Sequence, residues 1–173
     1  AVERAGLKPE DIDEVVMGNV ASVAENAFMA RLCSVKAGIP YSAGAITVNR
    51  LCSSGLQAIV TAAQEIQCGF ANIVVAGGAE SMDNIPYYIR KARFGMRMGH
   101  GEFEDGLITA LSDPFTRNHM GITAENICAK FGLTREEQDV YAATSQQRAA
   151  AARDAGKFKD EIVPVEVKVS RKE

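Results

Sequence analysis

The chain has 173 residues, of which 47% are hydrophobic and 24% are charged, and its formal net charge is −3. This apolar content is enough for one medium-sized domain or for parts of two, and the acidic balance gives no electrostatic case for binding nucleic acid. No run of about 18 apolar residues occurs, so we expect no segment that spans a membrane.

Four cysteines indicate the chemical setting. They lack the C-x-x-C spacing of metal or redox sites, so we expect no metal site. Nothing in the sequence suggests secretion, which predicts reduced thiols and a cytoplasmic protein. An organellar location stays open, because a targeting segment could precede the first residue. The cysteines are Cys33, Cys52, Cys68 and Cys128.

Strands alternate with helices in the first 81 residues. Runs of β-prone residues predict strands at residues 15–20, 45–49 and 72–76. Apolar residues at helical spacing predict helices over residues 26–37 and 56–66, each followed by a glycine that ends it. This alternation is typical of a layered α/β fold with parallel strands, in which functional groups collect beyond the strand ends.

Cys52 lies where the strand predicted at residues 45–49 gives way to a helix. The free N–H groups in the first turn of a helix favour a thiolate over a thiol, so this position suits a nucleophile. Ser53, Ser54 and Gly55 are small enough for a sharp turn and for close approach of backbone N–H groups to a bound carbonyl oxygen. An arbitrary free cysteine is more often a small buried hydrophobe than a nucleophile, and we interpret the other three as structural or half-exposed residues without a catalytic role.

The second half of the chain has a different texture. Residues 83–118 are rich in Gly and Pro and predict a long irregular segment, whose basic side chains we interpret as a solvated or subunit-contact face. A helix is predicted over residues 125–131, and the capping box Thr134-Arg135-Glu136-Glu137 starts another. Residues 162–167 alternate as a strand would.

Three segments, in their order along the chain, resemble the thiolase family. They are Asn49-x-x-Cys52-Ser53-Ser54-Gly55-Leu56-x-Ala58, Gly77-Gly78-Ala79-Glu80-Ser81-Met82 and His119-Met120-Gly121-Ile122-Thr123-Ala124-Glu125-Asn126. Three ordered motifs at the family's spacing are far more specific than one. The resemblance implies a thiolase-like layered α-β-α fold, present here in part.

The resemblance also implies an acyltransferase reaction. In thiolases a cysteine thiolate takes an acetyl group from acetyl-CoA, and a second acetyl-CoA, deprotonated at its α-carbon, attacks the acyl-enzyme. The products are acetoacetyl-CoA and CoA, and the reverse reaction is thiolysis. Cys52 matches the nucleophile, and its backbone N–H is expected to contribute to the oxyanion site. Coenzyme A and acetyl-CoA are then substrates, and no prosthetic group is expected.

Substrate contacts are implied for residues of the third motif. In short-chain biosynthetic thiolases the His-Met pair lines the pantetheine tunnel beside the acyl pocket, so His119 and Met120 match substrate-binding residues. Leu111 matches a further lining position. Many degradative 3-ketoacyl-CoA thiolases lack this histidine, which favours acetyl and acetoacetyl substrates.

The family's organisation implies that the chain is an N-terminal fragment. Residues 1–81 would be most of the N-terminal core half without its first strand. Residues 82–173 would be part of the loop domain, which covers coenzyme A and contributes to oligomer contacts. The family segments that supply the activating histidine, an asparagine-held water and a second cysteine do not occur in this sequence. We therefore expect the chain alone, without its C-terminal half, to be inactive.

Two other functions stay open for the parent protein, which we expect to be a homo-oligomer, either a dimer or a tetramer. The first is a degradative 3-ketoacyl-CoA thiolase that accepts a broader range of chain lengths. The second, of a different class, is a catalytically dead protein that binds acyl-CoA or a protein partner.

Overall fold

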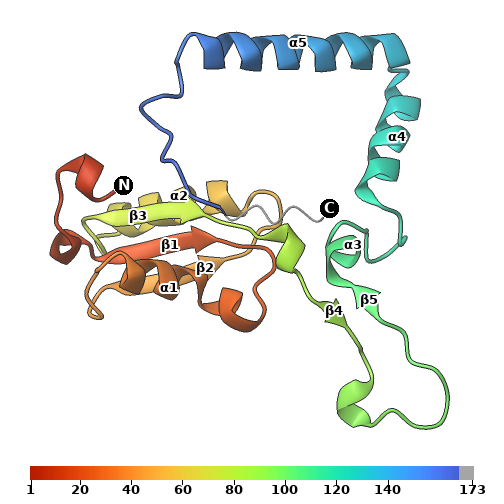
Figure 1. Ribbon diagram of the computed structural model, residues 1–173, viewed down its shortest axis with the longest axis horizontal. Coiled ribbons are helices and arrows are strands. Elements are labelled where there is room, and N and C mark those ends of the chain that lie inside the picture. Colours follow the sequence, from red (N-terminus) through yellow and green to blue (C-terminus); the bar gives the residue numbers. More distant parts are fainter. Residues whose placement is uncertain (168–173) are drawn as a thin grey trace. The chain divides into compact units, whose positions relative to one another are not determined.

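The structure, a computed structural model, describes residues 1–167 (Figure 1). The chain divides into two units, residues 1–107 and residues 108–173. The boundary at residues 81 and 82 that the sequence suggests concerns the family's domain organisation and stays a prediction.

A parallel sheet of three strands forms the first unit's centre. Its strands are β1 (Glu14–Gly18), β2 (Gly44–Val48) and β3 (Val74–Gly78), in the order β2-β1-β3. Val16 of the central strand pairs with Ile46 on one side and Ala76 on the other. Because β1 has a neighbour on each side, it is the most deeply buried strand, and Val16 has 0% exposure.

Two helices cover this sheet, α1 (Met29–Lys36) and α2 (Ser54–Gln67). Figure 1 shows them on opposite faces, which right-handed crossovers require when the chain moves from β1 outward to β2 and then back past β1 to β3. The small residues Ala30 on α1 and Ala58 on α2 are fully buried. Each helix therefore lies close to the sheet, as the predicted layered α/β fold requires.

The strands and helices predicted for this unit are confirmed, with shifted ends. The strand predicted at 15–20 ends at Gly18, and the strand predicted at 72–76 begins at Val74. The helix predicted over 26–37 is split, because residues Ala24–Phe28 form a 3-10 turn before α1 begins. Further 3-10 turns are Glu3–Ala5, Pro9–Asp11, Met82–Asn84 and Ala92–Phe94.

The irregular segment predicted at 83–118 contains only short elements. Strands β4 (Tyr87–Tyr88) and β5 (Glu104–Asp105) form a small antiparallel pair, and α3 (Gly106–Ala110) follows directly. Arg90, just after β4, pairs with Glu104 of β5 at 2.6 Å, a contact that raises the pKa of Arg90. At least one basic side chain of this segment therefore has a partner within the hairpin.

Helices α4 (Met120–Phe131) and α5 (Arg135–Asp154) are the two long helices of the second unit. The helix predicted over 125–131 begins earlier than expected, because His119 caps it at Met120. Gly132 ends α4 in the left-handed conformation, with φ of +68°, which glycine adopts without a steric penalty. The strand predicted at 162–167 is wrong: these residues pair with no strand, and alternation alone does not make one.

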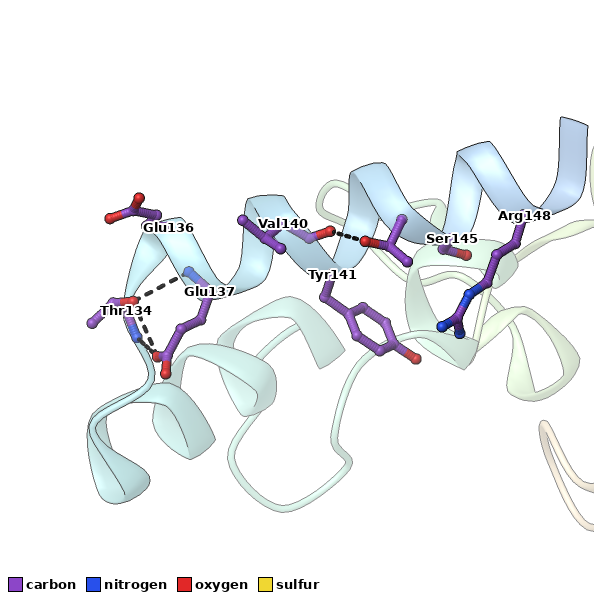
Figure 2. Close-up of a pocket in the computed structure, with 8 residues that line it drawn as sticks. Thr134, Glu136, Glu137, Val140, Tyr141, Ser145 and Arg148 are labelled. Atoms are coloured by element: carbon purple, nitrogen blue, oxygen red, sulfur yellow. Dashed lines mark hydrogen bonds between the residues drawn. The ribbon is translucent and has the colours of Figure 1, made fainter. Parts of the chain in front are cut away.

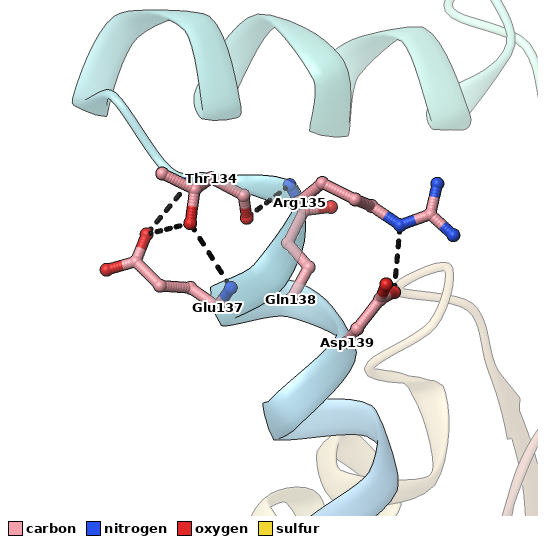
Figure 3. A network of polar contacts seen from close by, with 5 residues as sticks. All are labelled: Thr134, Arg135, Glu137, Gln138 and Asp139. Atoms are coloured by element: carbon pink, nitrogen blue, oxygen red, sulfur yellow. Dashed lines mark hydrogen bonds and ion pairs between the residues drawn. The ribbon is translucent and has the colours of Figure 1, made fainter.

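Local contacts define the start of α5 (Figure 3). The Thr134 hydroxyl accepts the N–H of Glu137 at 3.2 Å, and the Glu137 carboxylate accepts the N–H of Thr134 at 2.8 Å. The predicted capping box is thus confirmed. The hydrogen bond from the Thr134 N–H lowers the pKa of the Glu137 carboxyl. Arg135 and Asp139 form an exposed ion pair one turn along at 2.8 Å, which contributes little to stability.

In the part of the chain that the structure describes, no helix combines the length and the apolar character needed to cross a membrane.

Candidate active site

Cys52 lies in a tight turn between β2 and α2, two residues before the helix begins. Its side chain is exposed and its thiol is free. The Ser54 N–H and Ser54 hydroxyl both donate to the carbonyl of Leu51, at 2.9 and 2.6 Å. The Ser54 hydroxyl also accepts the N–H of Arg50 at 2.9 Å. These bonds fold residues 50–54 back on themselves and present Cys52 at the beginning of α2.

Leu51 has a strained backbone conformation in this turn. Its φ is +50°, a left-handed conformation that is disfavoured for a branched side chain without a local compensating contact. The Asn49 side chain supplies such a contact, because its Oδ1 accepts the N–H of Leu51 at 2.9 Å. The turn that precedes Cys52 is therefore strained and held by a side chain two residues upstream.

Close contact between glycines places this turn at the carboxyl ends of the strands. A Cβ added at Gly18, the last residue of β1, would lie 2.5 Å from the carbonyl carbon of Ser54 and 2.7 Å from the nitrogen of Gly55. A Cβ at Gly78, the last residue of β3, would lie 3.1 Å from the carbonyl oxygen of Gly18. The start of α2 thus lies directly against the end of the central strand, where parallel α/β proteins bind their ligands.

Asn19 was not predicted as a site residue, although it follows Gly18 at this edge. It has 1% exposure, and its side-chain amide donates to the carbonyl of Ala79 at 2.9 Å and to the carboxylate of Glu80 at 3.0 Å. The sequence offered one signal for Asn19, because a polar residue directly after a buried strand often lies at a functional edge of the sheet. Glu80 belongs to the second thiolase-like motif, to which sequence reasoning gave no individual role.

No base contacts the thiol from within its own unit. Among residues 1–107, no carboxylate, imidazole or amine is hydrogen-bonded to the sulfur of Cys52. The other cysteines are free as well: Cys33 and Cys128 are half-buried and Cys68 is exposed. Cys52 alone among the four lies in a strained turn at the edge of the sheet.

The three predicted substrate-binding residues lie in the second unit, where a closed loop brings them together. The Met120 N–H donates to the carbonyl of Leu111 at 2.9 Å, and His119 pairs with Ser112 in a single antiparallel bridge. Asp113 stabilises the intervening turn by accepting the N–H groups of Thr116 and Phe115, which lowers the pKa of its carboxyl. Leu111 and Met120, nine residues apart in the sequence, are therefore in direct contact.

His119 also caps α4. Its Nδ1 accepts the N–H of Gly121 at 3.1 Å, so that nitrogen carries no proton in this arrangement and Nε2 is left as the N–H donor. Met120, the first residue of the helix, is 43% exposed. The pair thus offers one hydrogen-bond donor and one flexible apolar side chain.

Two hollows of the second unit do not include these residues. One lies along α5 and is lined by Thr134 and by residues of the helix itself, including Tyr141 and Arg148 (Figure 2). A second is lined by residues of α4 and α5, among them Cys128 and Asp139. Neither contains Leu111, His119 or Met120.

Within residues 1–167 no group of three or more His, Cys, Asp or Glu side chains could hold a metal ion.

These features define a class of protein: a layered α/β protein that presents a cysteine at a strand-to-helix turn beyond the ends of parallel strands. The family model described as the thiolase N-terminal domain matches residues 1–173. The chain therefore belongs to the thiolase family, as the three motifs predicted.

Similar proteins agree with this assignment. An acetyl-CoA acetyltransferase of Pseudomonas aeruginosa is 48% identical over 167 residues, which are 96% of this chain and 42% of that protein. The crystal structure of the acetyl-CoA acetyltransferase of Bacillus anthracis is 42% identical, with a TM-score of 0.92 over 99% of this chain and 44% of that one. The human mitochondrial 3-ketoacyl-CoA thiolase in complex with CoA is 45% identical, with a TM-score of 0.92 over 97% of this chain and 43% of that one.

The chain thus spans less than half the length of the relatives that it matches. The high TM-scores confirm the predicted thiolase-like α/β fold.

Proposed function

We propose that Cys52 is the acyl-accepting nucleophile of an acyltransferase that condenses two molecules of acetyl-CoA into acetoacetyl-CoA and CoA. The observation that carries this proposal is the place of Cys52 in a thiolase-family chain: exposed, at the start of α2 and beyond the ends of the parallel strands. An exposed thiol in that position is accessible to a substrate, and it directly precedes the first turn of a helix, a location that favours a thiolate.

The first chemical step is acyl transfer to sulfur. The Cys52 thiolate attacks the thioester carbonyl of acetyl-CoA, a bond forms between Sγ and the acyl carbon, and the bond to the sulfur of CoA breaks. CoA leaves as a thiolate and takes up a proton. One thioester replaces another, so neither direction faces a deep free-energy trap. N–H groups at the turn would stabilise the negative charge on the carbonyl oxygen.

The second step forms the new carbon–carbon bond. A second acetyl-CoA loses a proton from its α-carbon, and the resulting carbanion attacks the acetyl group on Cys52 and releases the thiolate. We propose that the residues that activate Cys52 and move the α-proton belong to the part of the relatives that this chain does not match, since it covers 42% of their length. The chain alone is then inactive.

Substrate recognition falls to the loop that joins Leu111 to Met120. Their backbone contact and the free Nε2–H of His119 support an assignment of all three side chains to the acyl and pantetheine end of coenzyme A. We further propose that residues 82–173 are part of a loop domain over CoA and that residues 1–81 are most of a core half. The whole protein would be a cytoplasmic homo-oligomer, a dimer or a tetramer, in fatty acid metabolism.

Active-site substitution tests the nucleophile. In the whole protein, Cys52→Ala should lower acetoacetyl-CoA thiolysis by at least about a thousandfold, the scale of nucleophile removal in covalent catalysis. Cys33→Ala, which removes a thiol from the same unit, is the matched control and should leave the rate unchanged. Transfer of an acetyl group to Cys52, read by peptide mass spectrometry, should disappear in the first variant only. Thiolysis by the purified 173-residue chain alone would contradict the proposed inactivity.

A chain-length series separates the main alternative. The similarity to human 3-ketoacyl-CoA thiolase keeps a degradative thiolase of broader range as the second candidate. Acetoacetyl-CoA should react faster than longer 3-ketoacyl-CoA substrates in the whole protein, and the reverse order would favour the degradative enzyme. If acyl-CoA binds but no substrate acylates Cys52, a catalytically dead acyl-CoA-binding protein becomes the better description.

A further inference from the structure

The loop after β3 is hydrogen-bonded to the loop after β1 through the carboxylate of Glu80. Glu80 Oε2 accepts the N–H of Val20 at 2.7 Å, and Oε1 accepts the N–H of Ala21 at 3.2 Å. The side-chain amide of the buried Asn19 donates to Oε1 as well, at 3.0 Å. One carboxylate therefore accepts hydrogen bonds from three successive residues and fixes the loop after β1 to the loop after β3.

The same peptide unit is held from its other side by Asn49. The Asn49 side-chain amide donates to the carbonyl of Val20 at 3.0 Å, and that carbonyl shares a planar peptide group with the N–H of Ala21. Glu80 and Asn49 thus hold opposite ends of one rigid plane. Asn49 then uses its remaining polar atom, Oδ1, to accept the N–H of Leu51 at 2.9 Å.

These contacts form a continuous path from Glu80 through the Val20–Ala21 peptide and Asn49 to Leu51, the residue before Cys52. Leu51 has φ of +50°, a conformation of order 1 kcal/mol or more above its alternatives that persists only where the surroundings hold it. Asn49 is the side chain that holds it, and its own orientation depends on the peptide that Glu80 fixes.

We propose that Glu80 and Asn49 are positioning residues for Cys52: acting through the Val20–Ala21 peptide, they hold the left-handed turn at Leu51 that aims the thiol at the edge of the sheet. The consequence for acyl transfer rests on the proposed function, because nucleophile misplacement by about 1 Å can cost around a hundredfold in rate. The positioning itself is a property of the first unit and can be measured without a CoA substrate.

The sheet offers a matched control at its opposite end. Asp13, just before β1, accepts the N–H groups of Asn72 and Ile73, just before β3, at 2.7 and 3.0 Å. Asp13 and Glu80 therefore tie the same two strands together by the same kind of bond, one at each end. Only Glu80 is connected to the turn of Cys52.

The test is alkylation of the 173-residue chain by iodoacetamide across a range of pH, with each cysteine followed by peptide mass spectrometry. Glu80→Gln and Asn49→Ala should each slow the reaction of Cys52 about fivefold, the effect of losing roughly one net hydrogen bond, and should displace its pH profile. Asp13→Asn should change neither. Cys68, exposed at the other end of α2, should react at the parental rate in every variant.

The double variant separates a connected path from two independent contacts. If both residues act on the same turn, Glu80→Gln with Asn49→Ala should slow Cys52 no more than the stronger single variant. If the fold-reductions of the two single variants multiply in the double variant, the proposal is overturned. It is also overturned if the rate of Cys52 alkylation against pH is the same in Glu80→Gln as in Asp13→Asn. If Glu80→Gln unfolds the unit, the alkylation rates of Cys52 and Cys68 change together. The comparison of Asn49→Ala with Asp13→Asn then tests the proposal: it fails if Cys52 reacts at the same rate in both variants.

These results do not depend on acetyl transfer. Failure of the whole protein to acetylate Cys52 would end the proposed function and leave the alkylation result standing. Acetylation by acetyl-CoA combined with unchanged alkylation in the Glu80 and Asn49 variants would end the positioning proposal alone.

Discussion

The two units differ in what defines their structure. The first contains the buried core, including Val15 and Val16 on the central strand and a cluster in which Ile12, Ile39 and Ala43 pack around Val15. Among the described residues of the second unit, 108–167, none is buried. The first unit therefore owes its structure to burial between elements, whereas the second owes its helices to contacts within each one.

Hydrogen bonds show the same difference. In the first unit, Asn19 and Glu80 are joined although they lie 61 residues apart, and Asp13 binds Ile73 across 60 residues. The side-chain hydrogen bonds that the structure describes in α5 span four residues or fewer, as between Thr134 and Glu137. A site that needs exact placement is better supported by the first arrangement, because long-range contacts fix elements relative to one another. This difference explains why the strained turn of Cys52 can persist there.

The largest effect is expected at the contact between β1 and α2. Gly18→Ala would place a Cβ 2.5 Å from a backbone carbon of Ser54, and backbone cannot move aside without separating the helix from the strand. We expect a loss of roughly 3 kcal/mol in the free energy of unfolding of the first unit. Urea unfolding measures this loss of free energy, and hydrogen exchange of the β1 amides assigns it to the first unit.

Gly55→Ala is the control for that substitution. Nothing lies within 4 Å of a Cβ at Gly55, and alanine is the better helix former, so stability should stay the same or rise. Equal effects of the two alanines would show that close packing at Gly18 does not define this edge.

A smaller and strictly local effect is expected in the second unit. Thr134→Ala removes the capping box and should cost α5 about 1 kcal/mol, which appears as faster hydrogen exchange at the Glu137 amide. The β1 amides should be unaffected. Thr144→Ala removes a hydroxyl that binds the carbonyl of Val140 in mid-helix, and it should leave α5 unchanged or more stable. Faster unfolding or weaker protection of the first unit in Thr134→Ala would contradict the separation of the two.

The smallest effect concerns pH and the amino end of the sheet. Burial, with the nearby charge of Glu65, raises the pKa of Glu14, while Arg31 lowers it in part. Because its folded pKa exceeds the unfolded one, its contribution to stability is complete at low pH and is lost as pH rises through the folded value. Glu14→Gln should therefore stabilise the first unit above about pH 5 by less than about 1 kcal/mol, and not below pH 4. A urea midpoint difference that is the same at both pH values would rule this out.

Sequence patterns predicted the elements with local signals best. The capping box at Thr134 and the glycine stop at Gly132 were correct because their hydrogen bonds lie within a few residues. The strand expected at 162–167 was wrong because a strand requires a partner, which alternation does not provide. The helix ahead of Gly132 was predicted too short, since a histidine that caps through Nδ1 is not a common start signal.

For the candidate site, the sequence by itself determined the family, the layered α/β fold and the place of Cys52 at a strand-to-helix turn, because residue order and motif spacing are carried by the chain. Only the tertiary structure decided which residues surround that turn. Asn19 and Glu80 lie 61 residues apart in two different loops, and the left-handed Leu51 is recognisable only once Asn49 is seen to bind it. Contacts of that kind arise from the parallel pairing of β1 with β3, which no local pattern encodes.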